Sequence, residues 1–276
     1  MCAFLKCCLL LLLPLTLVAQ PNKKQLIIRC DDIGMCHAVN MAAKKMAETG
    51  LPFSASVMFA CPWYQEAVEM LRNQPQVAIG IHLTLTSEWK SYRWGPITGR
   101  TAVPSLVDSL GYFRATVPDF LRQQPKLEEI ETEFRAQIKR AIGTGLPITY
   151  MDYHMGAGTY TPEQRKLLEK LAGEYQLSMS GNFAEQNISV PSLPSDQLTA
   201  GIINALQKCK PGNNLMVFHL GLETPEMDAL QDLNPGGVKQ MSRQRHGELK
   251  TLTSPGFKAA LQKQGITPVT YRSLTK

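Results

Sequence analysis

Two adjacent aspartates, Asp31 and Asp32, stand where a short apolar segment, Gln25–Cys30, gives way to a turn that contains Gly34. Neighbouring carboxylates repel each other, and one of them tends to be neutralised unless a cation is near. Because α/β proteins build their active sites at the carboxyl ends of strands, the pair suggests metal chemistry with a base beside the metal. The alternative is a capped turn, since Asp is common at turns and helix N-termini.

Three histidines favour the metal site over the capped turn. His82, His154 and His219 each lie at the end of an apolar segment typical of a β-strand. One such histidine is more often structural, but parallel strands would bring all three to one rim, facing the aspartates. One carboxylate and two imidazoles leave positions open on a divalent ion for water and substrate. The remaining carboxylate and histidine can then serve as base and acid.

The other two histidines and the cysteines indicate no second site. His37 lies in the first predicted turn and is interpreted as a surface or capping residue, and His246 lies in a polar segment without a ligand role. The cysteines beyond residue 20 are Cys30, Cys36, Cys61 and Cys209. Their spacing fits neither a disulfide scaffold nor a paired-cysteine zinc site. We expect mostly buried thiols, and the alternative is that two of these cysteines form one disulfide.

The elements that must position these residues alternate between short apolar segments and amphipathic stretches. The predicted strands are Leu26–Cys30, Ser54–Phe59, Val77–Leu83, Ile148–Asp152, Leu177–Ser180, Leu215–Leu220 and Thr267–Tyr271. Strand–helix alternation repeated about seven times implies a mostly parallel sheet. Closure into an irregular barrel is favoured over an open sheet, and 276 residues is a common length for an α/β barrel. No linker or repeat divides the chain, which predicts a single domain.

Two helices carry clear sequence signals. The first is predicted over Lys126–Ile142 and ends at Gly143. Its apolar face comprises Leu127, Ile130, Phe134, Ile138 and Ile142. The second begins at a capping box, Thr161–Gln164, with proline at the first helical position. Its predicted core positions are Leu167, Leu168 and Leu171.

Two long connections, Thr86–Pro125 and Glu223–Gly247, separate the predicted elements. Connections of this length in one domain are usually lids or binding loops. The first contains Trp89 and Trp94, whose flat faces suit the apolar C–H faces of sugar rings. The alternative is that these rings only pack the loop onto the barrel.

The N-terminal segment differs from the rest of the chain. Residues 7–19 are largely apolar but fall short of the roughly 20 residues that span a bilayer, so we expect no transmembrane anchor. Residues 1–19 are interpreted as a signal peptide that ends at Ala19, and residues 20–276 as the barrel domain. This interpretation predicts that the protein is exported, most readily to a bacterial periplasm. The formal charge of +6 comes from scattered basic residues, which excludes a nucleic-acid partner.

The chain resembles the YdjC-like carbohydrate deacetylases, which include chitooligosaccharide deacetylases and hopanoid-associated homologues. The resemblance covers about residues 24–274. Its landmarks, in order, are Cys30–Gly34, Gly80–Thr86, Thr149–His154, Leu215–Gly221, Arg245–Leu249 with Leu252–Pro255, and Gly265–Arg272. No single motif is decisive, but the first five in order are specific, and the ending Gly265–Arg272 also matches. The chain departs from the family where Met155 and Gly156 replace further histidines, and where Ile33 replaces a usual Phe.

The resemblance implies a distorted TIM-like (β/α) barrel that holds a divalent metal ion, Mg or Zn. It assigns the metal ligands to Asp32, His82 and His154. It makes Asp31 the general base, kept charged by Arg245, and His219 the group that protonates the leaving amine. The implied activity is metal-dependent removal of acetyl groups from an N-acetylated mono- or oligosaccharide. Two alternatives stay open: hydrolysis of another amide or ester on glycans, and a catalytically silent glycan-binding barrel.

Overall fold

One curled parallel sheet carries the strand ends on which the predicted site depends. The structure is a computed structural model, and it describes residues 23–275. The strands are β1 (Lys24–Ile33), β2 (Phe53–Val57), β3 (Val77–Leu83), β4 (Ile148–Tyr153), β5 (Ser178–Met179), β6 (Gln186–Asn187), β7 (Gly212–His219) and β8 (Ile266–Val269). The helices are α1 (His37–Glu48), α2 (Tyr64–Leu71), α3 (Val117–Arg122), α4 (Leu127–Gly143), α5 (Pro162–Glu174), α6 (Ser195–Ala205), α7 (Pro225–Asp228), α8 (Met241–Thr253), α9 (Pro255–Lys263) and α10 (Tyr271–Leu274).

The sheet has the order β5-β4-β3-β2-β1-β7-β6, and β8 pairs with the first half of β1 beside this path. All pairings between these strands are parallel. Between residues 23 and 275 no pairing joins β5 to β6, so the sheet curls without closing. The distorted TIM-like fold in a single domain is confirmed, whereas the predicted closure of the sheet is not formed among the described residues. The short strand β6 is the one that the apolar pattern did not predict, because both of its residues are exposed.

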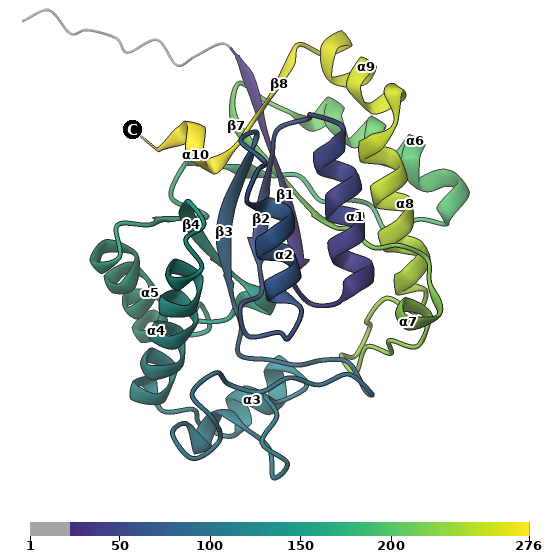
Figure 1. Ribbon diagram of the computed structural model, residues 1–276. Coiled ribbons are helices and arrows are strands. Elements are labelled where there is room, and N and C mark those ends of the chain that lie inside the picture. The colour runs from purple at the N-terminus through teal and green to yellow at the C-terminus, as the bar shows by residue number, and fades with distance from the viewer. Residues whose placement is uncertain (1–22, 276) are drawn as a thin grey trace, which may run out of the picture.

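Helices cover the outer face of this sheet, with α4 and α5 on one side and α1, α8 and α9 on the other (Figure 1). In α4 the central part of the predicted face is buried, at Ile130, Phe134 and Ile138. The two end members of that face, Leu127 and Ile142, are 37% and 46% exposed in the terminal turns of the helix. Burial of the central turns is what attaches the helix to the sheet.

The start of α5 has one half of the predicted capping box, whereas Gln164 Oε1 has no hydrogen-bond partner among the described residues. The Thr161 hydroxyl accepts a hydrogen bond from the Gln164 N–H at 3.3 Å, and Pro162 is the first helical residue. The side-chain oxygen satisfies a donor that a helix start leaves free. The predicted core positions Leu167, Leu168 and Leu171 are all buried.

Aromatic and polar side chains fill the inside of the curl. The Tyr150 ring on β4 lies across Gly80 on β3, where an added Cβ would stand 2.3 Å from the ring. The same ring packs on Tyr271 with centroids 4.5 Å apart. Glycine at this position lets a large ring occupy the centre of the sheet.

Both long connections lie at the carboxyl end of the strands, the end that carries α3 and α7 in Figure 1. The second is shorter than predicted, because α8 already begins at Met241. The four cysteines of the described chain are buried and free, so the thiol prediction is confirmed and the disulfide is not formed. Within residues 23–275 no helix is long and apolar enough to cross a membrane. The predicted signal peptide, residues 1–19, lies outside the described residues.

Candidate active site

The two aspartates reach the same pocket because β1 is irregular at its end. The β1–β2 register shifts between Cys30 and Ile33, and Asp32 has a φ of +63°. Consecutive residues of a regular strand point to opposite faces, whereas a bulge redirects a side chain. Asp31 and Asp32 consequently both line one cavity. A left-handed aspartate at this point is a locally strained conformation, of the kind that concentrates at functional sites.

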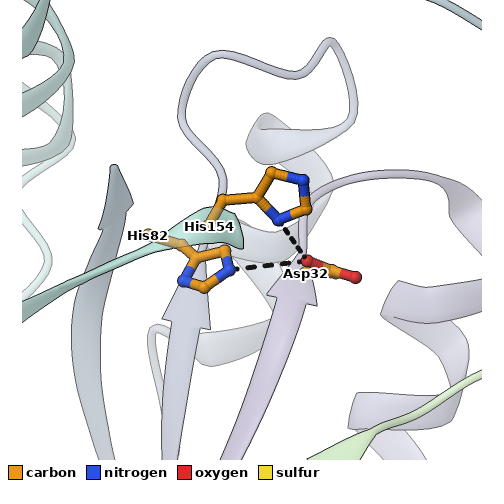
Figure 2. Close-up of side chains that lie close together, drawn as sticks. All are labelled: Asp32, His82 and His154. Carbon is orange, nitrogen blue, oxygen red and sulfur yellow. Dashed lines mark ion pairs between the residues drawn. The ribbon is translucent and has the colours of Figure 1, made fainter. Parts of the chain in front are cut away.

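Asp32, His82 and His154 form the predicted cluster, and each offers an atom within 4.8 Å of the others. Figure 2 shows both imidazole rings directed at one oxygen of Asp32. His82 Nε2 lies 3.5 Å from Asp32 Oδ1, and His154 Nδ1 lies 3.2 Å from the same atom. The three residues come from the ends of β1, β3 and β4, as expected for a rim built by parallel strands.

The outer nitrogens of both rings are held by carboxylates. His82 Nδ1 lies 2.8 Å from Asp152 Oδ1, and His154 Nε2 lies 2.9 Å from Glu88 Oε2. Carboxylates only accept, so these nitrogens carry hydrogens, and in the neutral form of each ring the other nitrogen directs its lone pair at Asp32. Asp32 Oδ1 is buried and has no hydrogen-bond partner among residues 23–275. One carboxylate oxygen and two imidazole lone pairs that converge in this way fit a divalent cation.

Electrostatics agree with a site built for positive charge. Burial alone would lower the pKa of His82, but Asp152 and Asp31 outweigh it and raise that pKa to about 9. Burial is likewise outweighed at His154, where Glu88 and Asp32 raise the pKa to about 10. In the metal-free protein both imidazole rings are therefore protonated on both nitrogens, and so positively charged, at neutral pH.

Each aspartate has its own arginine, and the predicted pairing of Arg245 with Asp31 was wrong. Arg245 Nη2 donates a hydrogen bond to Asp32 Oδ2 at 2.6 Å. Asp31 instead accepts two hydrogen bonds of 2.7 Å from Arg29. Burial would raise the pKa of both carboxyls, but Arg29 lowers that of Asp31 and Arg245 that of Asp32. The physical reason is position: Arg29 is two residues before Asp31 on one strand face, whereas Arg245 on α8 reaches Asp32.

His219 lines the same cavity and is the register partner of Asp31 on the adjacent strand β7. Burial lowers its pKa, although Asp32 acts in the opposite direction, so the ring is neutral at pH 7. Its backbone N–H donates to Glu248 Oε2 at 2.7 Å. Burial raises the pKa of Glu248 to about 7. The site thus brings a neutral imidazole close to the ionised Asp31.

The cavity has a volume of about 240 Å³. Trp89, one of the two predicted substrate contacts, lines it. Trp94 does not: its side chain is buried beneath the cavity wall, with Nε1 donating to the Thr86 carbonyl at 2.9 Å. For Trp94 the packing alternative therefore holds. Met155 and Val238 are 44% and 43% exposed and form an apolar part of the wall.

Four further charged residues complete the site and were missed from the sequence: Arg29, Glu88, Asp152 and Glu248. Spacing carried a signal for Arg29, which lies two residues before Asp31. Asp152, likewise two residues before His154, is the register partner of His82. Glu88 lies in a long connection, where no periodic pattern indicates the direction of a side chain. His37 is exposed and bonds Glu66, in agreement with a surface role.

Comparison with known proteins places the chain among sugar-active relatives. A curated carbohydrate deacetylase from Enterococcus faecalis is 29% identical over 272 residues, covering 92% of this chain and 99% of the relative. A carbohydrate deacetylase from Thermus thermophilus is 30% identical, covering 76% and 83%. A solved structure from Enterococcus faecalis V583, provisionally named a cellobiose-phosphate cleavage protein, has a TM-score of 0.77 and 26% identity. It covers 92% of this chain and 100% of that chain.

The family comparison covers most of the chain. The model of the family described as YdjC-like protein matches residues 25–263, from the second residue of β1 to the end of α9, and this range includes every site residue named above. The chain belongs to the YdjC-like protein family.

Proposed function

We propose that this chain is a metal-dependent hydrolase that removes acetyl groups from N-acetylated sugars. The observation that carries the proposal is the convergence of His82 Nε2 and His154 Nδ1 on the unpartnered Asp32 Oδ1. The carbohydrate deacetylases among its relatives support a sugar substrate. A divalent ion, Mg²⁺ or Zn²⁺, held by Asp32, His82 and His154 would polarise the acetyl carbonyl and lower the pKa of a water molecule.

Asp31 is the general base in this proposal. Both of its oxygens bind Arg29, which keeps the carboxylate ionised and fixes its orientation. As water attacks the acetyl carbon, Asp31 accepts a proton from it. A carboxylate whose pKa is lowered is a weak base. This role therefore requires a water molecule whose own pKa is lowered as well.

His219 delivers a proton to the departing amine. The ring is neutral at rest, so it must first gain the proton that it donates. Asp31 and His219 are register partners on β1 and β7, which makes transfer of the water proton between them short. An amine leaves poorly as an anion, so this proton determines whether the C–N bond breaks.

The experiment combines metal content with acetate release. Chelated protein, reloaded with Mg²⁺ or Zn²⁺, is assayed on matched panels of N-acetylated and O-acetylated sugars. His82→Ala and His154→Ala should lose metal while staying folded, whereas the control His37→Ala, at an exposed imidazole, should behave as the wild type.

The outcomes separate the alternatives. Acetate release from O-acetylated sugars alone would identify a glycan esterase instead. Metal binding and sugar binding without acetate release would identify a silent glycan-binding barrel. Full metal occupancy in either His→Ala variant would refute the ligand assignment.

A further inference from the structure

We propose that Glu88 is a positioning residue for the metal centre: its carboxylate fixes the His154 ring so that Nδ1 is the atom facing the metal. The inference rests on the metal site of the proposed function. Glu88 lies in the connection between β3 and α3 and contacts neither Asp32 nor His82. Its role is therefore exerted through His154.

The two histidines face Asp32 through different ring nitrogens. His82 lies within β3 and faces Asp32 with Nε2, the ring atom far from its backbone. His154 lies beyond β4, on a short turn where Met155 has a φ of +50°, and faces Asp32 with Nδ1. A ring that binds through the atom nearest its backbone must be oriented from its far end. For His154 that end is Nε2, 2.9 Å from Glu88 Oε2.

The burial of Glu88 shows that the contact is specific. The residue is 3% exposed, and a buried carboxylate is costly unless it is paired. Within residues 23–275, His154 is the only hydrogen-bond or ion-pair partner found for this carboxylate. No arginine or lysine shares it, in contrast to Asp31 and Asp32. The contact with the His154 imidazole is thus what the buried Glu88 carboxylate provides.

The segment that carries Glu88 is itself fixed from two sides. The Glu88 carbonyl accepts from the Leu233 N–H at 2.9 Å, and the Lys90 N–H donates to the Gln231 carbonyl at 2.9 Å. The next residue, Trp89, lies over Arg245, with the guanidinium 5.7 Å from the ring centre. Arg245 in turn binds Asp32. The dipeptide Glu88–Trp89 therefore supports two candidate ligands, His154 through Glu88 itself and Asp32 through the contact of Trp89 with Arg245.

The test compares Glu88→Ala and Glu88→Gln with a matched control, Glu133→Ala. Glu133 is equally buried and holds the same connection, accepting from the Ile97 N–H at 3.0 Å and the Thr98 hydroxyl at 2.8 Å. It contacts no candidate ligand. Zn²⁺ and Co²⁺ affinities are measured by chelator competition, the Co²⁺ absorption spectrum is recorded, and thermal unfolding is followed without metal.

We expect Glu88→Ala to weaken metal binding by about 10- to 100-fold and to change the Co²⁺ spectrum. The metal affinity of Glu88→Gln should lie between those of the wild type and Glu88→Ala, because its amide oxygen accepts the same N–H without the charge. Glu133→Ala should lower the unfolding temperature and leave the affinity unchanged. A Glu88→Ala protein with wild-type affinity would overturn the inference, and so would an equal loss in Glu133→Ala.

The inference and the proposed function fail differently. Wild-type protein that binds no divalent metal would overturn the metal centre and this inference with it. Wild-type protein that binds metal but releases no acetate would overturn only the catalytic proposal, while the affinity comparison would still decide the role of Glu88.

Discussion

Charge balance at the residue scale explains why the site needs a cation. Four carboxylates surround the cluster: Asp31, Asp32, Glu88 and Asp152. Arg29 pairs with Asp31 and also lies 3.0 Å from Asp152, and Arg245 pairs with Asp32. Two negative charges remain in a buried region where uncompensated charge is costly. Either a divalent ion or two protonated imidazoles can supply the balance.

Metal binding should therefore release protons. With pKa values of about 9 and about 10, His82 and His154 are protonated at pH 7 in the metal-free protein. Ligation requires their lone pairs, so binding near pH 7 should release about two protons, and affinity should rise with pH until those pKa values are passed. Calorimetry of Zn²⁺ binding in buffers with different ionisation enthalpies measures the release. A heat independent of the buffer would contradict the prediction.

The roles of the two aspartates can be separated by a conservative exchange. Asp31→Asn should retain metal and lose turnover by roughly two to four orders of magnitude, the range for a lost general base. Asp32→Asn should lose metal, because it weakens the oxygen on which both histidines converge. Metal analysis and acetate release, measured on the same preparations, give the answer. The reverse pattern would show that the two roles are exchanged.

His219 should affect amide and ester substrates differently. An amine must be protonated to leave, whereas an activated ester expels a stable oxyanion without help. His219→Ala should therefore reduce N-deacetylation much more than hydrolysis of an activated acetyl ester, with metal content unchanged. Parallel assays of both substrates test this. An equal loss on both would leave His219 only a structural role at the end of β7.

At the element scale, periodicity predicted the elements better than their ends. The strand at Val77–Leu83 is confirmed residue for residue, because an uninterrupted buried run has clear limits. β1 instead continues through Asp31 and Asp32 to Ile33, since the bulge lets polar residues stay in the strand. Topology made His82 and His154 predictable as neighbours. Which arginine meets which aspartate was not predictable, because it depends on where α8 lies relative to β1.

The contact between β3 and β4 depends on a residue without a side chain. Gly80→Ala should destabilise the fold by about 1–3 kcal/mol, the usual cost of overpacking, because the Tyr150 ring is fully buried and cannot move aside. The matched control is Gly143→Ala in α4, where an added Cβ meets nothing within 4 Å. Equilibrium urea unfolding of both variants measures the difference. Unchanged stability in Gly80→Ala would show that the sheet interior is more yielding than this packing indicates.

At the scale of the whole molecule, the fold concentrates its chemistry at one end. The candidate site cavity lies at the carboxyl end of the sheet, where Arg245 and Glu248 reach it from α8, while the helices cover the outer face of the sheet (Figure 1). The opposite end, where β8 joins β1, contributes to the sheet and not to the site. Such a division allows the loops to set the substrate while the strands hold the reacting groups.

We propose that residues 1–19 direct export and are removed, which would place this activity outside the cytoplasm. The apolar run at residues 7–19 has the length of a signal core and ends at Ala19, a small residue suited to a cleavage site. The chain described by the fold starts soon afterwards, at residue 23, so removal of residues 1–19 would leave β1 intact. Protein recovered from an export-competent bacterial host should therefore begin near Gln20. Intact mass and N-terminal sequencing of the periplasmic fraction measure this, with a variant lacking residues 2–19 as the cytoplasmic control. Recovery of the full-length chain from the membrane fraction would instead show that the segment is retained as an anchor.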